Sequence, residues 1–272
     1  MRKLDGKVAY VTGGGRGIGR AVCLKLASDG ARIVVNDLDT EPANVVVDEI
    51  RAMGGDAIAV PGSVSDPSFG DGYIAAGVEA FGGVDIIVNN AGFTWDAMIH
   101  KMTDNQFDAI IDVHMKAPFR ILRAASRFII PAAKAEFAEG RPVTRKVVNI
   151  SSVSGTQGNP GQVNYSSAKA GITGMTRTLA REWGRYNVNV NCVAFGLIST
   201  RLNEAAEEKK HVEVDGNKVP IGLPPAVRSG FESMIPMGRL GTQEEGAGSV
   251  WLFCVPESDY VSGQTLVVAG GP

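Results

Sequence analysis

The sequence predicts an α/β fold in which helices cover both faces of a doubly wound, parallel β-sheet. Short runs of apolar, β-branched residues alternate along the chain with longer segments that have helical spacing. The short runs are mainly apolar, which is typical of strands buried on both faces. The chain has no linker or break in composition. We therefore expect one domain over residues 1–272, with about seven strands.

Seven runs are expected to be strands. They are KVAYV, RIVVND, DAIAV, DIIVNN, KVVNIS, NVNVNCVA and TLVVA. The expected helices lie near residues 17–29, 41–53, 66–81, 103–131, 164–186 and 242–254. Two of these have capping-box spacing at their start, with Thr103 before Gln106 and Thr242 before Glu245. Pro42 stands where a first-turn proline is tolerated.

Two insertions interrupt the alternation, at about 134–146 and 203–230. The first reads KAEFAEGRPVTRK and precedes the fifth strand. The second is polar, contains Pro and Gly, and follows the sixth strand. Because open α/β sheets bind ligands at the carboxyl ends of their strands, we interpret 203–230 as a substrate lid. A surface loop without function is the alternative.

Composition narrows the class of function. The 272 residues carry a formal net charge of −2, which gives no electrostatic case for binding nucleic acid or an anionic membrane. Cys23, Cys192 and Cys254 are odd in number and form no CxxC motif, so neither a disulfide framework nor a metal site is indicated. No signal peptide or membrane-spanning run is seen. We expect a soluble, cytoplasmic protein that acts on small molecules.

A glycine-rich loop follows the first expected strand. It reads VTGGGRGIGR (11–20), with Gly13, Gly17 and Gly19 in GxxxGxG spacing. Glycines let phosphates approach the backbone, and the helix that follows offers free N–H groups and a positive dipole. A simple tight turn is the alternative. Between a strand and a helix, the loop favours a Rossmann-like dinucleotide site.

Asp37 ends the second expected strand, 20 residues beyond Gly17. A carboxylate there can accept hydrogen bonds from the adenosine ribose and would repel a 2′-phosphate, which favours NAD(H). Arg16 is an opposing signal because its guanidinium could pair with that phosphate. NADP(H) therefore remains the alternative cofactor.

Three further features support an enzyme. Tyr165 and Lys169 are four residues apart on an expected helix and share one of its faces. Ser152 precedes Tyr165 by thirteen residues, and the sequence NNAG (89–92) follows the fourth strand. Together with the glycine loop, these residues resemble the short-chain dehydrogenase/reductase family over nearly the whole chain.

Two groups within that family are most similar. The stretch NISSVSGTQGNPGQVNYSSAKAGITG resembles the catalytic segment of bacterial 3-oxoacyl-ACP reductases. The stretches VVNDL, GSV and VHMKAPF resemble the (3R)-hydroxyacyl-CoA dehydrogenase module of peroxisomal multifunctional enzyme type 2. The resemblance implies an NAD(P)(H)-dependent oxidoreductase of fatty acid metabolism that interconverts 3-oxoacyl and 3-hydroxyacyl thioesters of ACP or CoA. It also implies a homotetramer. A dehydrogenase of another secondary alcohol (a small alcohol, a sugar or a steroid) and a non-catalytic dinucleotide-binding protein are the alternatives.

The resemblance also implies roles for the three polar residues. Tyr165 would exchange a proton with the substrate oxygen while hydride moves at the nicotinamide. Because a tyrosine pKa near ~10 makes a poor base, Lys169 would be the cation that favours the ionised form, and it would hold the nicotinamide ribose. Ser152 would hydrogen-bond the same substrate oxygen. A turn hydroxyl at a strand end is the alternative for Ser152.

The cofactor contacts are carried over in the same way. Asn90 would lie beside the cofactor and brace the sheet, and Ile198 and Thr200 would bind the carboxamide. The usual Pro-Gly before them is Phe195-Gly196 here, and Ser63 stands where many relatives have an aspartate near the adenine. The full expected set is Gly13, Arg16, Gly17, Ile18, Gly19, Asp37, Ser63, Val64, Asn90, Ala91, Gly92, Tyr165, Lys169, Ile198 and Thr200.

His114 lies in IIDVHMKAPFR (110–120), a helical stretch with a proline inside it. Relatives commonly have an asparagine at this position, whose carbonyl holds a water that links Lys169 to solvent. In an α-helix the N–H of residue 118 would bond to the carbonyl of residue 114, but Pro118 has no N–H. We expect the His114 carbonyl to serve this relay while its side chain packs locally. Acid–base work by the imidazole and a plain structural histidine are the alternatives.

Overall fold

Seven parallel strands form the centre of the computed structural model, which describes residues 2–201, 204, 210–222 and 224–271. The sheet order is β3-β2-β1-β4-β5-β6-β9, and every neighbouring pair is parallel. These strands are the seven runs predicted from the sequence, so the predicted doubly wound fold is confirmed. The strands of the sheet are β1 (Val8–Val11), β2 (Arg32–Val35), β3 (Ala57–Ala59), β4 (Ile86–Asn89), β5 (Arg145–Ser152), β6 (Val188–Phe195) and β9 (Thr265–Val268).

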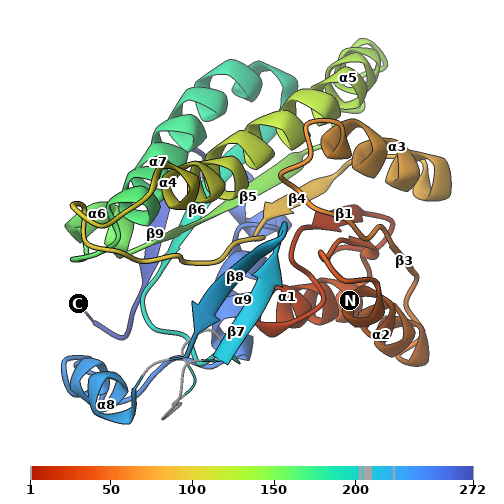
Figure 1. Ribbon diagram of the computed structural model, residues 1–272. Helices are drawn as coiled ribbons and strands as arrows, with labels where there is room; N and C mark the ends of the chain where they lie inside the picture. The colour runs from red at the N-terminus through yellow and green to blue at the C-terminus, as the bar shows by residue number, and fades with distance from the viewer. Residues whose placement is uncertain (1, 202–203, 205–209, 223, 272) are drawn as a thin grey trace.

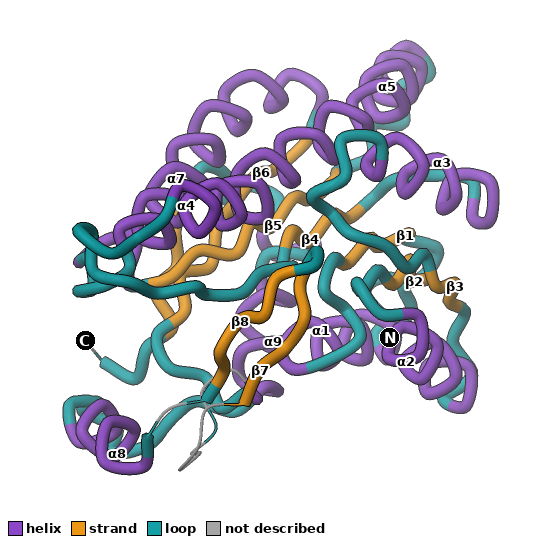
Figure 2. Tube along the Cα trace, in the orientation of Figure 1, coloured by secondary structure: helices purple, strands orange, loops and turns teal. Residues whose placement is uncertain are grey.

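Helices cover both faces of the sheet (Figures 1 and 2). On one face lie α1, α2 and α9, and on the other lie α3, α4, α5 and α7. Each layer encloses its own cluster of buried apolar side chains, because alternate residues of the strands point to opposite faces. Within the described part of the chain, no helix combines the length and apolarity needed to cross a membrane. The main helices are α1 (Gly17–Ser28), α2 (Thr40–Ala52), α3 (Phe69–Phe81), α4 (Asp104–Ile111), α5 (Ala117–Ala138), α7 (Val163–Trp183) and α9 (Gln243–Leu252).

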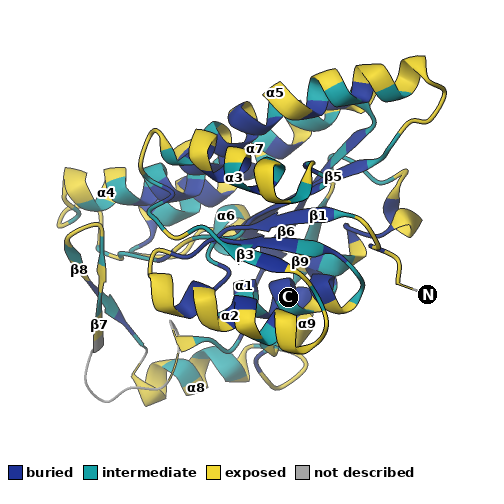
Figure 3. Ribbon diagram, turned by 90° about the vertical axis from the view of Figure 1, so that its right-hand side faces the viewer, coloured by how far each residue is buried: buried dark blue, intermediate teal, exposed yellow. Residues whose placement is uncertain are grey.

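The last long helix, α9, packs against the first, α1. Gly246 of α9 lies beside Ile18; a Cβ atom at Gly246 would be in ordinary van der Waals contact with the Ile18 methyl group, at 3.5 Å. At the other end of the contact, the Trp251 indole N–H donates to Asp29 over 2.8 Å. Figure 3 shows the buried strands between the two layers of helices, with exposed residues on α2 and α9. The glycine loop is thus supported by residues from the opposite end of the chain.

Both predicted capping boxes are present. The hydroxyl of Thr103 accepts from the N–H of Gln106, and Thr242 accepts from Glu245, with the return bonds also made. Each box satisfies N–H groups that the first turn of a helix leaves free. Pro42 lies in the first turn of α2, as expected. The helix begins at Thr40, and Asp39 is the residue that precedes it.

The predicted helix over 103–131 is divided by a π-helical turn. Between α4 and α5, η1 (Asp112–Lys116) is a π-helix in which the N–H of Ala117 bonds to the carbonyl of Asp112. Pro118 follows directly and cannot donate to His114, so the regular pattern is broken by covalent structure. The second part, α5, runs on to Ala138 with Pro131 inside it. The segment predicted as an insertion at 134–146 therefore begins in helix and ends in β5.

The second predicted insertion, 203–230, forms structure outside the main sheet. Strands β7 (Lys210–Val214) and β8 (Asn217–Ile221) pair as an antiparallel hairpin, and α8 (Pro225–Ser233) follows. Residues 203, 205–209 and 223 of the predicted segment lie outside the described residues. The remaining short helices are α6 (Ser154–Gln157), η2 (Gly184–Tyr186) and η4 (Pro256–Ser258).

Candidate active site

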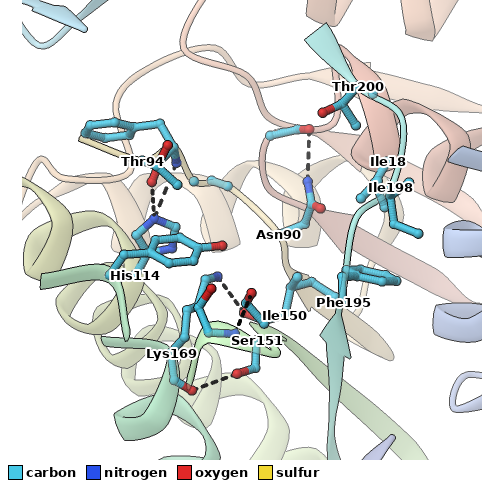
Figure 4. Close-up of a pocket in the computed structure, with 18 of the residues that line it drawn as sticks. Ile18, Asn90, Thr94, His114, Ile150, Ser151, Lys169, Phe195, Ile198 and Thr200 are labelled. Carbon is cyan, nitrogen blue, oxygen red and sulfur yellow. Dashed lines mark hydrogen bonds between the residues drawn. The ribbon is translucent and has the colours of Figure 1, made fainter. Parts of the chain in front are cut away.

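A cleft of about 830 Å³ opens at the carboxyl ends of the strands. Parallel α/β sheets bind ligands at this edge, at the position where the order of strands changes direction. In this sheet β2 and β3 lie on one side of β1, and β4, β5 and β6 lie on the other. Every residue that the sequence predicted as catalytic or cofactor-binding lines this one cleft. They are Gly13, Arg16, Gly17, Ile18, Gly19, Asp37, Ser63, Val64, Asn90, Ala91, Gly92, His114, Ser152, Tyr165, Lys169, Ile198 and Thr200. Figure 4 shows Lys169 and His114 at one end of the cleft, and Thr200, Ile18 and Ile198 at the other.

The glycine loop is packed too tightly for side chains. A Cβ atom at Gly19 would overlap the carbonyl oxygen of Gly13, and one at Gly13 would lie 2.9 Å from Cα of Ala91. Gly13 also has a φ of +61°, which glycine adopts without strain. The Asn90 side chain donates to the carbonyls of Thr12 and Gly13 at 2.9 and 3.1 Å, so it connects the glycine loop to the end of β4.

The start of α1 has the geometry of a phosphate site. No side chain caps this helix at Arg16. The first N–H groups of a helix lack partners within it and carry its positive dipole. The uncapped N-terminus beside a loop without side chains fits a dinucleotide pyrophosphate.

Acidic groups surround the position expected for the adenosine ribose. Asp37 accepts a hydrogen bond from the N–H of Gly15 at 3.0 Å. The Arg16 guanidinium lies 3.9 Å from Asp37 and 2.8 Å from Asp39, so two carboxylates already neutralise it. Arg201 also lines this part of the cleft and was not predicted; burial and the Arg16 charge lower its pKa.

Ser152, Tyr165 and Lys169 meet at the inner end of the cleft. Ser152 ends β5, while Tyr165 and Lys169 lie one turn apart on α7. The Lys169 ammonium donates to the carbonyl of Ile150 over 2.7 Å and lies 5.4 Å from the centre of the Tyr165 ring. The Ser151 hydroxyl donates to the Lys169 carbonyl over 2.7 Å, which ties α7 to β5 (Figure 4).

Burial is the main cause of the pKa shifts of Tyr165 and Lys169. Burial raises its pKa to about 12, although a hydrogen bond with Ser152 acts in the opposite direction, and the charge of Asp96 raises it further. Burial also lowers the pKa of Lys169 to about 8. The role of Lys169 in favouring the ionised tyrosine stays a prediction; in the structure its ammonium is bonded to the carbonyl of Ile150. At neutral pH Tyr165 carries its proton.

His114 is buried behind Tyr165, and its ring meets the tyrosine ring edge-on at 5.1 Å. Its Nε2 lies 2.8 Å from the carbonyl oxygen of Phe93, to which it donates in the tautomer that is protonated at Nε2. Burial, and then the Lys169 charge, hold the His114 pKa well below 6.5. The imidazole is neutral at pH 7 and packs locally, as expected.

Phe195-Gly196 continues β6 at the point where relatives commonly have Pro-Gly. The N–H of Gly196 donates to the carbonyl of Val268 over 3.0 Å, and Phe195 pairs with Val268 in register. A Cβ at Gly196 would lie 2.7 Å from that of Ala269, so glycine is required here for steric reasons.

Two polar residues near Tyr165 were missed from the sequence. Asp96 lines the cleft and accepts a hydrogen bond from the Gln162 side chain over 2.8 Å. Burial raises the pKa of Asp96. Gln162 is at the start of α7 within the quoted catalytic stretch, but Asp96 lies in a loop with no motif around it.

The fold and the cleft together define a dinucleotide-dependent oxidoreductase. More particularly, the chain belongs to the short-chain dehydrogenase family, whose model matches residues 7–211. The family uses a nicotinamide dinucleotide.

Similar proteins match along the whole chain. The 3-oxoacyl-[acyl-carrier-protein] reductase of Synechocystis sp. is 37% identical over 273 residues, covering 100% of this chain and 98% of the relative. The 3-oxoacyl-[acyl-carrier-protein] reductase FabG of Thermotoga maritima is 34% identical over 269 residues, covering 99% and 98%. A crystal structure of a dehydrogenase/reductase from Sinorhizobium meliloti has a TM-score of 0.83 at 31% identity, covering 99% and 96%.

Proposed function

We propose that the protein reduces a 3-oxoacyl thioester, carried by ACP or CoA, to the 3-hydroxyacyl thioester. The observation that carries this proposal is the meeting of Ser152, Tyr165 and Lys169 in the cleft that holds the glycine loop. Relatives named as 3-oxoacyl-[acyl-carrier-protein] reductases at 33–37% identity support the substrate class. They do not favour a small-alcohol, sugar or steroid dehydrogenase, or a protein that only binds the dinucleotide.

The side chains supply the proton for this reduction. When bound, the nicotinamide supplies a hydride to the 3-oxo carbon. Tyr165, with a pKa of about 12, carries the proton that the substrate oxygen needs to become a hydroxyl. Ser152 donates a hydrogen bond that holds this oxygen in place. Lys169 places a positive charge beside the tyrosine and stabilises the tyrosinate that is left after its proton is transferred.

NADH is the proposed cofactor. Asp37 is fixed by Gly15 at the ribose position, and a 2′-phosphate there would meet its negative charge. Arg16 is engaged by Asp39, so its charge is largely used within the protein. NADPH is the competing cofactor, because Arg16 and Arg201 both border this part of the cleft. The predicted homotetramer and cytoplasmic location stay predictions.

The test is reduction of acetoacetyl-CoA with NADH and with NADPH, in parallel with a panel of small ketones, oxidised sugars and ketosteroids. We expect oxidation of NADH with the thioester. Tyr165→Phe should abolish turnover while NADH binding, followed by its fluorescence, is kept. Tyr260→Phe, at a fully exposed tyrosine outside the cleft, is the matched control and should remain active. Absence of turnover with the thioester and either cofactor would overturn the proposal.

A further inference from the structure

The β7–β8 hairpin ends in a tight two-residue turn at the mouth of the cleft. Val214 and Asn217 are paired, so Asp215 and Gly216 form the turn between them. Both have positive φ, +48° and +78°, as a type I′ turn requires. This turn matches the twist of the strands and fixes the direction in which the Asp215 side chain leaves the hairpin.

One face of the hairpin belongs to the cleft. Val212 and Val214 line the cavity, and Val219, which pairs with Val212, is fully buried. Since paired residues share a face in an antiparallel ladder, these valines form the inner surface of the hairpin. His211 and Glu213 alternate with them and are exposed on the outer surface. The hairpin is thus a wall of the cleft with a polar exterior.

Two hydrogen bonds attach the hairpin to the rest of the molecule. Asn105 of α4 donates to Asn217 over 3.0 Å. At the tip, the Ser63 hydroxyl donates to Oδ2 of Asp215 over 2.9 Å. The same hydroxyl accepts from the N–H of Ser65 at 3.2 Å, which aims its hydrogen at Asp215.

The Ser63 side of this contact is the end of the cleft where the cofactor base would lie. Asp37 marks the ribose position at the end of β2. The N–H of Gly62 donates to the Asp37 carbonyl over 2.9 Å, so the loop after β3 lies directly beside that position. Leu38 and Val64 also line the cleft here and offer apolar surface to a flat aromatic ring.

We propose that Asp215 completes the base subsite and selects a cofactor whose base carries an exocyclic amino group. This inference rests on the proposed function, since it needs a dinucleotide in the cleft. Ser63 engages one oxygen of the Asp215 carboxylate. The second oxygen accepts a hydrogen bond from the amino group of adenine. Hypoxanthine has a carbonyl oxygen in place of the amino group. In its dinucleotide this oxygen would face the carboxylate oxygen of Asp215, and two acceptors cannot form a hydrogen bond.

The test measures, by fluorescence titration, the binding of NADH and of its deamino analogue, the reduced form of nicotinamide hypoxanthine dinucleotide. A hydrogen bond to a charged group contributes about 1.5–3 kcal/mol, so wild type should prefer NADH by about tenfold or more. Asp215→Gly tolerates the positive φ and removes the carboxylate, and it should lower this preference at least fivefold, mainly by weakening NADH binding. Asp215→Asn, which also tolerates the turn, should reduce the preference without removing the side chain.

Glu213→Gln is the matched control. It removes the same charge from the same hairpin, but from the outer face, and should keep the wild-type preference. Wild type that binds both dinucleotides equally, or Asp215→Gly that keeps full preference while its circular dichroism matches wild type, would overturn the inference alone. Wild type that binds no nicotinamide dinucleotide would overturn the proposed function as well.

Discussion

Gly92 lies flat against the imidazole ring of His114, so close that a Cβ atom at Gly92 would overlap the ring and lie 2.9 Å from its Nδ1. The same ring is hydrogen-bonded to Phe93 through Nε2. His114 therefore fixes the loop after β4, which carries part of the cleft, against the π-helical turn. This contact gives the histidine side chain a structural function.

Gly92→Ala should destabilise the protein by about 1–3 kcal/mol, because a methyl group forced into a packed site displaces its neighbours. It should also lower reductase activity. Urea unfolding measures the first effect. The double variant with His114→Ala should recover much of the loss, since the methyl group then has room. Strictly additive losses would contradict this contact.

His114→Asn should keep most activity, whereas Pro118→Ala should impair it more. Alanine restores an N–H at position 118, which can bond back to the carbonyl of residue 114 and close the helix. Steady-state rates of both purified variants measure the difference. The reverse order of activities would show that the imidazole itself takes part in the reaction.

Lys169→Met should change stability in a pH-dependent way. The folded-state pKa of Lys169 is lowered to about 8 from 10.5, so the unfolded state binds more protons between these values. Wild-type stability therefore gains from this group as pH rises from 8 toward 10.5, and the cost of burying the charge is complete below pH 8. The free energy of unfolding of the variant, relative to that of wild type, should therefore be higher at pH 7 than at pH 10. Unfolding free energies at the two pH values decide this, and an equal difference at both would contradict it.

Asp37→Ser should shift cofactor preference toward NADPH by about 10- to 100-fold in kcat/KM. Removing the carboxylate ends its repulsion of the 2′-phosphate of NADPH and also removes its hydrogen bond to the ribose of NADH, together about 1.5–3 kcal/mol. Asp39→Asn should produce a smaller shift in the same direction, because it weakens the partner of Arg16. Rates with both cofactors at fixed substrate measure the ratios. An unchanged ratio for Asp37→Ser would remove this residue from cofactor choice.

The sheet and the set of residues lining the cleft were predictable because their signals are local and periodic. Buried parallel strands are apolar throughout, and the glycine loop and the pair Tyr165 and Lys169 have fixed spacing. The carboxyl ends of parallel strands then bring these residues together without further information.

The hairpin was missed although the sequence contains its signal. Asp215-Gly216 stands between the alternating runs HVEV and NKVPI, which is a typical type I′ hairpin pattern. Its two strands alternate polar and apolar residues and lack the apolar runs that mark the strands of the main sheet. The bond between Ser63 and Asp215 joins residues 152 positions apart, and no local pattern indicates it.

The division of the long helix was also not predictable from periodicity. Apolar spacing continues through Asp112–Lys116, so a π-turn does not interrupt the pattern. The expected end of this helix at residue 131 was wrong, because α5 continues through Pro131. A proline leaves the carbonyl four residues before it without its helical partner. Pro131 is exposed, so water can bond that carbonyl. The raised pKa of Tyr165 likewise depends on how deeply the folded chain encloses it.

The packing of α9 on α1 has a consequence for how the protein is made. Gly246 and Trp251 are synthesised more than 200 residues after their partners Ile18 and Asp29. While the chain emerges from the ribosome, the glycine-loop helix has one side uncovered until translation is almost complete. A chain that is cut short before residue 243 would carry the loop and Tyr165 but would leave α1 without its partner helix.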